Sequence, residues 1–530
     1  MKSCVVLSGL ACLVATVALA ADESVDADFI LRGGTLYKGD GTPGVPGDVA
    51  VRDGKIVAVG QFKPGRVDRI IDCQRLCIAP GFIDLHTHSD QQVVSPTLRA
   101  CVNYVIQGCT TSVTGNCGSG PTDIDDFYTK INAAGAGTNV AHLLPQGSLR
   151  ERVIGSTERK ATPEELEKMK ELTGKAMRDG AWGMSTGLIY VPSVYADTEE
   201  LIELAKVTAT HGGIYASHIR GEGRDLLTAV QEAVRIGETA GLPVHVSHFK
   251  SSGSENWGLI RQAAALIEDA RKKGRVVTAD QYPYTASSTS LEATLFPTWA
   301  RSGGNRELIK RLDDPEAGPR IKLQVQRDID RAADGAATFI ARYSARPEWV
   351  GKNLKQIAED AGQPALEIAC EIVRNGGAAV VNFSMSEDDV RYAMQLPWVA
   401  TASDGRSYLP DADRPHPRSY GTFARKVGFY AIREKVLPLE QAIRSASGLP
   451  ADILGLHDRG YLKNGQAADI VVFDPEQYVD NATFNEPHHY ASGVRFVFVN
   501  GTPAVHEGVP TGALAGRALK RPPKDKTTAK

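Results

Sequence analysis

Hydrophobic and polar positions follow one pattern at the two ends of the chain and another between them. From Phe29 to Ala79, short alternating segments are separated by turns, and RDGK between two apolar strands suggests a hairpin. The same alternating pattern recurs near the carboxyl end of the chain, in GYLKNGQAADIVVFDPE and GVRFVFVNGTPAVHEG. We therefore expect residues 21–80 and 456–515 to build a small β-sandwich domain together.

Between these ends, residues 81–455 alternate buried strands with amphipathic helices. The strand candidates are GFIDLH, CTTSVTG, NVAHLLP, AWGMSTG, GIYASHI, PVHVSHF, VVTADQYP, AAVVNFS and WVATASDG. Helical patterns such as TPEELEKMKELTGKAMRDG and RDLLTAVQEAVRIGETAG lie between several of them. This alternation predicts parallel strands, and about eight repeats favour a closed (β/α)8 TIM-like barrel. We expect a helical insertion near residues 300–365 and a solvated basic tail over residues 516–530.

Length and composition agree with this two-part α/β architecture. A chain of 530 residues is too long for one ordinary core, and 42% hydrophobic and 23% charged residues are typical of a soluble α/β protein. The net charge of −3, without a basic stripe carrying interleaved aromatic residues, argues against nucleic acid as a partner. Nothing in the pattern defines an oligomeric state.

The first twenty residues, MKSCVVLSGLACLVATVALA, read as a secretory signal peptide cleaved after Ala20. The alternatives are an uncleaved membrane anchor and a lipoprotein site at Cys12, which the small residues at the end and Gly9 disfavour. No later apolar run reaches the roughly twenty residues that a membrane span needs. We expect an exported protein, periplasmic or secreted.

Cysteine usage does not indicate a disulfide scaffold. Two of the eight cysteines lie in the signal segment. The other six, in about 510 residues, are too few to stabilise the fold mainly by disulfides. Cys73 and Cys77 could pair after export. Cys117 belongs to the candidate chemistry described next.

Potential metal ligands follow several of the predicted barrel strands. They are His86, His88, Cys117, His218, His248 and Asp404. Residues at the carboxyl ends of barrel strands converge at one mouth. In HTH, side chains alternate along the strand, so both imidazoles are expected to face the barrel axis. An isolated pair could equally hydrogen-bond locally, but ligands at other strand ends favour a metal.

Two successive strands end in Ser-His, at His218 and His248, and GNCG places Cys117 after a third strand. A thiolate with two imidazoles makes three protein ligands for zinc and leaves a position open. The rival interpretations of Cys117 are a small buried filler and a nucleophile. We expect His211, which follows a helix, and His245, on the opposite face from His248, to be structural.

Asp404 in TASDG stands at a late strand end, before a glycine. Alone, such an aspartate is usually a turn residue. Beside a metal site, its carboxylate can accept a proton from an attacking water and pass it to a leaving nitrogen. We therefore interpret Asp404 as a candidate general base.

The chain resembles the amidohydrolase superfamily from about residue 27 to 515. GFIDLHTH and ASDG are similar to motifs of the whole superfamily, whereas GNCG, GMSTGLIYVP, ASHIRGE, VSHFK, YPYTASS and PHPRSYGTF resemble the N-acyl-D-amino-acid deacylase (D-aminoacylase) branch. This resemblance implies a zinc-dependent enzyme that hydrolyses the amide bond of N-acyl-D-amino acids.

The resemblance also implies roles for particular residues. Cys117, His218 and His248 match a tightly held zinc site, while His86, His88 and Asp404 match a second, weaker metal site that is often empty in this branch. Asp404 also matches the general base of the family. No lysine in GMSTGLIY can bridge two metals, which is consistent with Cys117 as the substitute ligand.

Substrate contacts are implied at Lys250, Tyr190, Tyr282, Ser288 and Arg418, which match residues that hold the carboxylate and amide. A guanidinium makes a bidentate pair with a carboxylate, and a lysine adds a point charge. In the segment after Ser288, we take Leu291, Leu295 and Phe296 to favour a neutral or apolar substrate side chain.

Two other functions were considered. A cyclic-amide hydrolase of the dihydropyrimidinase type would need a bridging lysine and lack GNCG. A non-catalytic barrel that only binds N-acyl amino acids or peptidoglycan fragments should have lost at least one ligand, yet all six positions are filled. Hydrolysis of N-acyl-D-amino acids is therefore the function that we expect.

Overall fold

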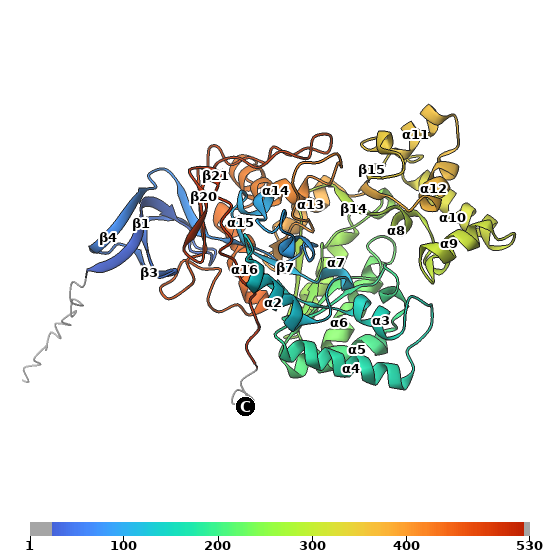
Figure 1. Cartoon of the computed structure of the whole chain (residues 1–530), viewed down its shortest axis with the longest axis horizontal. Helices are drawn as coiled ribbons and strands as arrows, with labels where there is room; N and C mark the ends of the chain where they lie inside the picture. The colour runs from blue at the N-terminus through green and yellow to red at the C-terminus, as the bar shows by residue number, and fades with distance from the viewer. Residues whose placement is uncertain (1–23, 524–530) are drawn as a thin grey trace, which may run out of the picture.

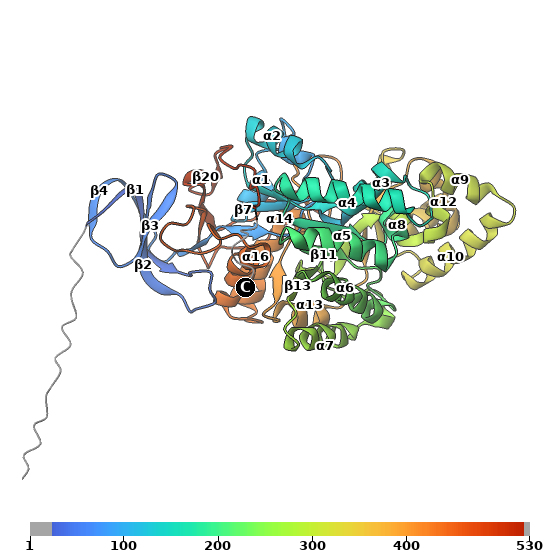
Figure 2. The ribbon, with the colours of Figure 1, turned by 90° about the horizontal axis from the view of Figure 1, so that it is seen from below.

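The structure is a computed structural model that describes residues 24–523. The predicted signal peptide lies outside these residues. Figures 1 and 2 show a central barrel with a β-rich unit at one end of the long axis and a mostly helical unit at the other. Within residues 24–523, none of the helices is both long and apolar enough to cross a membrane.

The centre is a (β/α)8 barrel. Its strands are β6 (Phe82–Asp84), β7 (Cys109–Thr114), β8 (Asn139–His142) with its continuation β9 (Leu144–Pro145), β10 (Gly183–Gly187), β11 (Ile214–His218), β12 (Val244–Val246), β13 (Val277–Gln281) and β17 (Val399–Thr401). They form two parallel sheets, β6-β7-β8 and β9-β10-β11-β12-β13-β17. A parallel bridge between Thr87 and Gly405 joins β6 to β17 and closes the ring. The predicted fold class is confirmed.

Helices surround the barrel (Figure 2). They are α1 (Val102–Val105), α2 (Ile124–Ala134), α3 (Gln146–Val153), α4 (Pro163–Arg178), α5 (Thr198–Thr210), α6 (Leu226–Ala240), α7 (Leu259–Lys272), α13 (Glu387–Met394), α14 (Arg418–Ala424), which runs into a π-helical turn (Arg425–Arg433), α15 (Leu439–Ala446) and α16 (Gly448–Leu454). Local sequence starts α4, because Thr162 and Glu165 form a capping box and Pro163 occupies the first turn. Its buried face includes Met169 and Met177, which anchor it to the barrel.

Both chain ends contribute to one nine-stranded sheet. Its strands are β1 (Val25–Leu36), β2 (Val45–Arg52), β3 (Lys55–Gly60), β4 (Pro64–Asp72), β5 (Cys77–Pro80), β18 (Ile470–Phe473), β19 (Val494–Val499), β20 (Thr502–His506) and β21 (Val509–Pro510). The two ends meet where β5 pairs antiparallel with β18. Side chains from both ends, such as Phe29 and Phe498 with ring centroids 4.5 Å apart, share one core.

The inserted unit is larger than residues 300–365 and is not purely helical. It contains the antiparallel sheet β14 (Ala286–Ser290), β16 (Ala379–Phe383) and β15 (Thr338–Arg342), with helices α8 (Leu291–Leu295), α9 (Asn305–Asp313), α10 (Ala317–Arg331), α11 (Leu354–Ala361) and α12 (Ala365–Arg374). AAVVNFS was therefore wrongly expected in the barrel. The apolar run of β16 is satisfied by antiparallel pairing with β14 and β15 instead of by parallel neighbours.

The basic tail is not solvated at its start. Leu519 accepts a hydrogen bond from Trp182 Nε1 on its carbonyl at 2.6 Å, and Val140 and Ala518 form a parallel bridge. The Arg521 guanidinium donates to the carbonyls of His211 and Gly212, before β11. These contacts close the amino-terminal end of the barrel, because paired backbone groups and the Leu519 side chain replace water there.

Cys73 and Cys77 are both buried free thiols, so the pairing considered for them does not occur in this structure. Burial is the main reason that the pKa of each thiol is raised to about 12. Each is therefore protonated at neutral pH and behaves as a small apolar residue.

Candidate metal centre and substrate cleft

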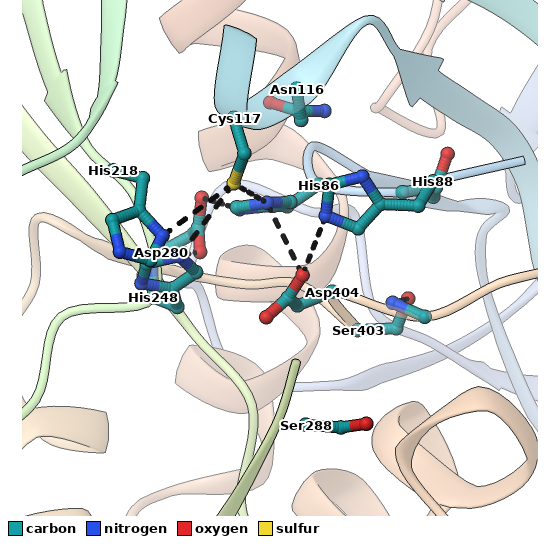
Figure 3. A network of polar contacts seen from close by, with 12 residues as sticks. His86, His88, Asn116, Cys117, His218, His248, Asp280, Ser288, Ser403 and Asp404 are labelled. Carbon is teal, nitrogen blue, oxygen red and sulfur yellow. Dashed lines mark hydrogen bonds and ion pairs between the residues drawn. The ribbon is translucent and has the colours of Figure 1, made fainter. Parts of the chain in front are cut away.

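The six predicted ligands lie together at the carboxyl ends of the barrel strands (Figure 3). His86 and His88 follow β6, Cys117 lies in the turn η2 (Asn116–Gly118) after β7, His218 ends β11, His248 follows β12 and Asp404 follows β17. Five are buried, and the His88 side chain is 20% exposed. The ends of five of the eight barrel strands thus supply one polar cluster.

Cys117 is the centre of the imidazole contacts. Its Sγ lies 3.2 Å from His86 Nε2 and 3.8 Å from both His218 Nδ1 and His248 Nε2. In Figure 3 the thiol points between the His218 and His248 pair and His86. Thiolate and imidazole are the donors that zinc prefers, so this set fits the ion that we predict.

Asp404 adjoins the same cluster from the other side. Its Oδ1 is 2.9 Å from His88 Nε2 and 3.4 Å from His86 Nε2, and its Oδ2 accepts a hydrogen bond from Arg418 Nη1 at 2.7 Å. The carboxylate therefore connects candidate metal ligands to a buried guanidinium.

Among residues 24–523, three overlapping groups of donor atoms are close enough to hold a metal ion. They are His86, Cys117 and His248; His86, His88 and Asp404; and His218, Glu222 and His248, with ligand atoms within 4.8 Å of one another in each group. His86 belongs to two of these groups and His248 to two. The predicted weak site, His86, His88 and Asp404, is one of these groups, whereas the predicted tight set of Cys117, His218 and His248 is not.

The backbone at the ligand positions is strained. Cys117, His248 and Asp404 adopt positive φ values of 50°, 36° and 50°. For residues other than glycine such conformations cost of order 1–3 kcal/mol each and persist only where the surroundings hold them. Gly115, two residues before Cys117, lets the turn pack closely against the Leu143 backbone, because a Cβ at this position would lie 2.1 Å from the Leu143 carbonyl oxygen. The GNCG turn is thus shaped to present the thiol.

Charges around the cluster favour an ionised thiolate and carboxylate. Burial would raise the pKa of Cys117, but the positive field of His86 and hydrogen bonds from His218 and His248 lower this pKa well below its usual range. Burial would likewise raise the pKa of Asp404, but Arg418 and His86 hold it well below its usual range. A ligand thiolate and an ionised base are therefore both present at neutral pH.

Asp280, at the end of β13, was not among the predicted site residues. Its carboxylate is 3.4 Å from His86 Nδ1, 2.8 Å from His245 Nε2 and accepts a hydrogen bond from the backbone N–H of His248 at 2.7 Å. It lies behind the cluster and orients two candidate ligands. His245, expected to be purely structural, reaches the site through this carboxylate.

Glu222 is a second residue that was missed. Its Oε1 is 2.8 Å from His248 Nδ1 and 2.5 Å from Lys250 Nζ. The Lys250 ammonium also donates to the His248 carbonyl at 2.8 Å, so its donors are engaged within this network. A carboxylate on Nδ1 fixes the imidazole so that Nε2 faces Cys117. Its place in ASHIRGE, four residues after a predicted ligand, was the available signal.

Arg418 and Tyr282 lie next to Asp404. The Arg418 guanidinium stacks over the Tyr282 ring at 4.8 Å and donates to the Ser288 carbonyl at 3.2 Å. The Tyr282 hydroxyl is buried without a hydrogen-bond partner among residues 24–523. Because a buried hydroxyl costs free energy when unpaired, this group is suited to a substrate oxygen.

Two further residues shape this region. The Tyr190 ring lies edge-on to His218 at 5.1 Å, and its hydroxyl is 3.0 Å from Thr289 Oγ1. His416, in PHPR, is 2.8 Å through Nε2 from the Ala286 carbonyl and accepts from the Arg418 backbone N–H through Nδ1 at 3.0 Å. His416 thus joins the start of α14 to β14 and fixes the position of Arg418.

The expected basis of side-chain selection is wrong. Leu291, Leu295 and Phe296 are buried in the core of the inserted unit and do not line the cleft. Their apolar side chains pack against their neighbours in this unit and stabilise it. The predicted preference for a neutral or apolar substrate side chain therefore has no support from these three residues.

Comparison with known proteins identifies the class. A family model described as amidohydrolase family matches residues 69–505, most of the chain. The fold and the donor cluster thus belong to a metal-dependent amidohydrolase that acts on linear amides.

More specific relatives follow. A D-aminoacylase from Alcaligenes xylosoxydans xylosoxydans is 35% identical over 95% of this chain and 99% of its own length. A structure on the role of the binuclear metal centre in D-aminoacylase, with one-metal activation and second-metal attenuation, is 33% identical, covers 93% of this chain and 100% of its own, and has a TM-score of 0.80. The structure of an N-acyl-D-glutamate deacylase from Bordetella bronchiseptica, with zinc and a phosphonate inhibitor, is 31% identical. It covers 94% of this chain and 100% of its own, and its TM-score is also 0.80. The chain belongs to the N-acyl-D-amino-acid deacylase (D-aminoacylase) family.

Proposed function

We propose that this protein hydrolyses the amide bond of N-acyl-D-amino acids and releases a carboxylate and a free D-amino acid. The observation that carries the proposal is the position of Asp404, 2.9 Å from His88 Nε2 and 2.7 Å from Arg418 Nη1. An N-acyl amino acid has a scissile amide and a free carboxylate a few bonds apart. A base between metal ligands and a guanidinium suits that spacing.

We propose zinc as the metal, with one ion held by Cys117, His218 and His248 and a second, weaker site at His86, His88 and Asp404. The soft thiolate and the imidazoles support zinc, as does the zinc in the related glutamate deacylase structure. When bound, zinc would act as a Lewis acid on the acyl carbonyl and the attacking water.

The protein's own residues complete the reaction. Asp404 takes a proton from the attacking water and then donates it to the departing amine, so that it ends the cycle ionised. Arg418 pairs with the substrate carboxylate, and the unpartnered Tyr282 hydroxyl donates to the same group. Lys250, held by Glu222 at 2.5 Å, adds positive charge beside them, and Tyr190 and Ser288 border the amide.

The geometry gives less support to the other functions. Strand β10, Gly183–Gly187, has no lysine that could bridge two ions, as a dihydropyrimidinase-type enzyme would require. A protein that only binds its ligand has no need for an ionised carboxylate between ligand imidazoles and a guanidinium. Both alternatives are therefore set aside in favour of deacylation.

A panel of N-acetyl-D- and N-acetyl-L-amino acids tests the proposal directly. We expect release of the free D-amino acid, at least about tenfold faster than release of the L-enantiomer, from protein whose zinc content is measured on the same sample. An inverted enantiomer places its side chain where the carboxylate must bind, so its amide misses the base. Zinc-loaded protein with no D-selective hydrolysis would rule out the proposed function.

Glu222→Gln is expected to weaken metal affinity about 10- to 100-fold, because outer partners of metal-bound histidines contribute that much. The glutamine can still accept from His248 Nδ1, 2.8 Å away, but leaves the charge of Lys250 uncompensated. Competition with a zinc chelator measures the affinity. Glu255→Gln, at an exposed residue of the short 3-10 helix Ser254–Asn256, is the control and should bind zinc like the unchanged protein.

We also propose that the protein is exported and cleaved after Ala20, as its first twenty residues support. Expression of the full chain in a bacterium with a periplasm should give a mature protein that begins at Ala21. Mass spectrometry of the periplasmic fraction measures this end. A mature protein that begins at Cys12 and carries lipid would instead support the lipoprotein alternative.

A further inference from the structure

The cleft that leads to Asp404 is positively charged at its outer end. Its cavity measures about 70 Å³, and its inner wall carries Asp404, Arg418 and Ser288, which the proposed reaction uses. Its outer wall carries Arg342 and Arg406, to which the proposed reaction assigns no role. Both arginines are exposed, so their charged groups face the solvent-filled entrance.

The two arginines reach the cleft from different parts of the fold. Arg342 ends β15 of the inserted unit, and Arg406 follows the strand-end turn that carries Asp404. The Arg406 backbone is fixed on both sides, since its N–H donates to Ser419 Oγ at 3.1 Å and its carbonyl accepts from Asn103 Nδ2 at 2.9 Å. The backbone of Arg406 is therefore held in place, while its guanidinium remains available to bind an anion.

Charge in the cleft is not balanced within the protein. Arg418 is compensated by Asp404 at 2.7 Å. Arg342 lies 3.9 Å from Asp413, too far for a direct hydrogen bond, and the guanidinium of Arg406 has no ion-pair partner among residues 24–523. One carboxylate thus faces two outer guanidinium groups, which leaves a net positive charge for a ligand.

Small side chains leave space between these cations. Ala341 and Ala379 line the cleft beside Arg342, and Tyr408, near Arg406, is half-buried. Long neutral side chains at these places would have filled the entrance. A slender substrate group can therefore reach from the reacting amide towards the arginines.

We infer that Arg342 and Arg406 form an anion subsite, and that the preferred substrates of this enzyme carry a second carboxylate besides the one held by Arg418. This inference rests on the proposed function and names its substrate class. The second carboxylate comes either from an acidic D-amino-acid side chain or from a dicarboxylic acyl group, because both present the same chemistry at the entrance.

Matched substrate pairs test the inference and distinguish the two sources. N-acetyl-D-glutamate is compared with N-acetyl-D-glutamine, and N-succinyl-D-leucine with N-pentanoyl-D-leucine. We expect kcat/KM to be at least about fivefold higher for the charged member of one pair, mostly through KM, because the subsite lies away from the reacting atoms. The preferred pair identifies the source, and high salt should reduce the preference.

Variants then assign the preference to these residues. Arg342→Gln and Arg406→Gln should each reduce the preference about two- to fivefold, since exposed ion pairs contribute that much. Turnover of the neutral substrates should stay unchanged. Arg306→Gln, at an exposed arginine of α9 away from the cleft, is the matched control and should retain the preference.

The inference is overturned if both pairs react equally, or if the preference persists in the double variant Arg342→Gln, Arg406→Gln. Hydrolysis of the neutral D-substrates in those cases would still support the deacylase function. If none of the D-substrates is hydrolysed by zinc-loaded protein, the proposed function itself fails. The two failures are therefore distinguishable in one experiment.

Discussion

Asp404→Asn lowers kcat for N-acyl-D-amino-acid hydrolysis by about 10²- to 10⁴-fold, the usual contribution of a general acid–base. The amide cannot take a proton from water, although it can still accept the hydrogen bond that Arg418 Nη1 donates at 2.7 Å. Zinc at Cys117, His218 and His248 is retained, because Asp404 is not in that set. Steady-state kinetics with metal analysis on the same sample measures both quantities.

Folding must be checked in this variant, since Asp404 and Arg418 form a buried ion pair. Breaking such a pair by removing one charge costs roughly 3–5 kcal/mol. Thermal unfolding of the zinc-loaded variant shows whether it is folded at the assay temperature. Asp269→Asn, at an exposed surface pair on α7, is the control and should have normal kcat. A folded Asp404→Asn enzyme with normal turnover would show that another group is the base.

Cys117→Ala abolishes tight zinc binding and, with it, activity. The thiol lies within 4 Å of the imidazoles of His86, His218 and His248, at 3.2, 3.8 and 3.8 Å. Loss of this donor should weaken zinc binding by more than the roughly 10- to 100-fold that loss of an outer partner costs. Chelator competition and metal analysis after dialysis measure the effect.

Cys370→Ala is the matched control, because Cys370 is also buried but lies in the core of the inserted unit. It should lose a little stability and retain zinc and activity. If Cys117→Ala kept both zinc and activity, the assignment of the tight site to Cys117, His218 and His248 would be wrong.

The barrel could be predicted from the chain because its strands are short, apolar and regularly separated by amphipathic helices. The eight segments that form it were all among the candidates. AAVVNFS was also included, since an apolar run of four residues looks the same whether its neighbours are parallel or antiparallel. Only the pairing of β16 with β14 and β15 distinguishes the two cases.

The ligand types could also be predicted, since strand-end histidines, a cysteine and an aspartate share one mouth in any such barrel. The supporting carboxylates are harder to find. The position of Glu222, four residues after His218, is the one hint in the sequence, and the roles of Asp280 and Glu222 depend on distances of 2.7–2.8 Å to His248 that the closed fold creates. His245 is a structural residue, as predicted from its orientation, and its link to the site through Asp280 is likewise visible only in the fold.

The seam of the barrel lies at the ligands themselves. The backbone N–H of Asp404 donates to the carbonyl of His86, and that of His88 donates to Gly405, both at 2.8 Å. The first and last strands of the barrel are therefore joined by the same residues whose side chains would coordinate metal. An ion bound by His86, His88 and Asp404 would link the first and last strands, so that opening this seam would require loss of the ion. Resistance to proteolysis should thus rise with metal occupancy.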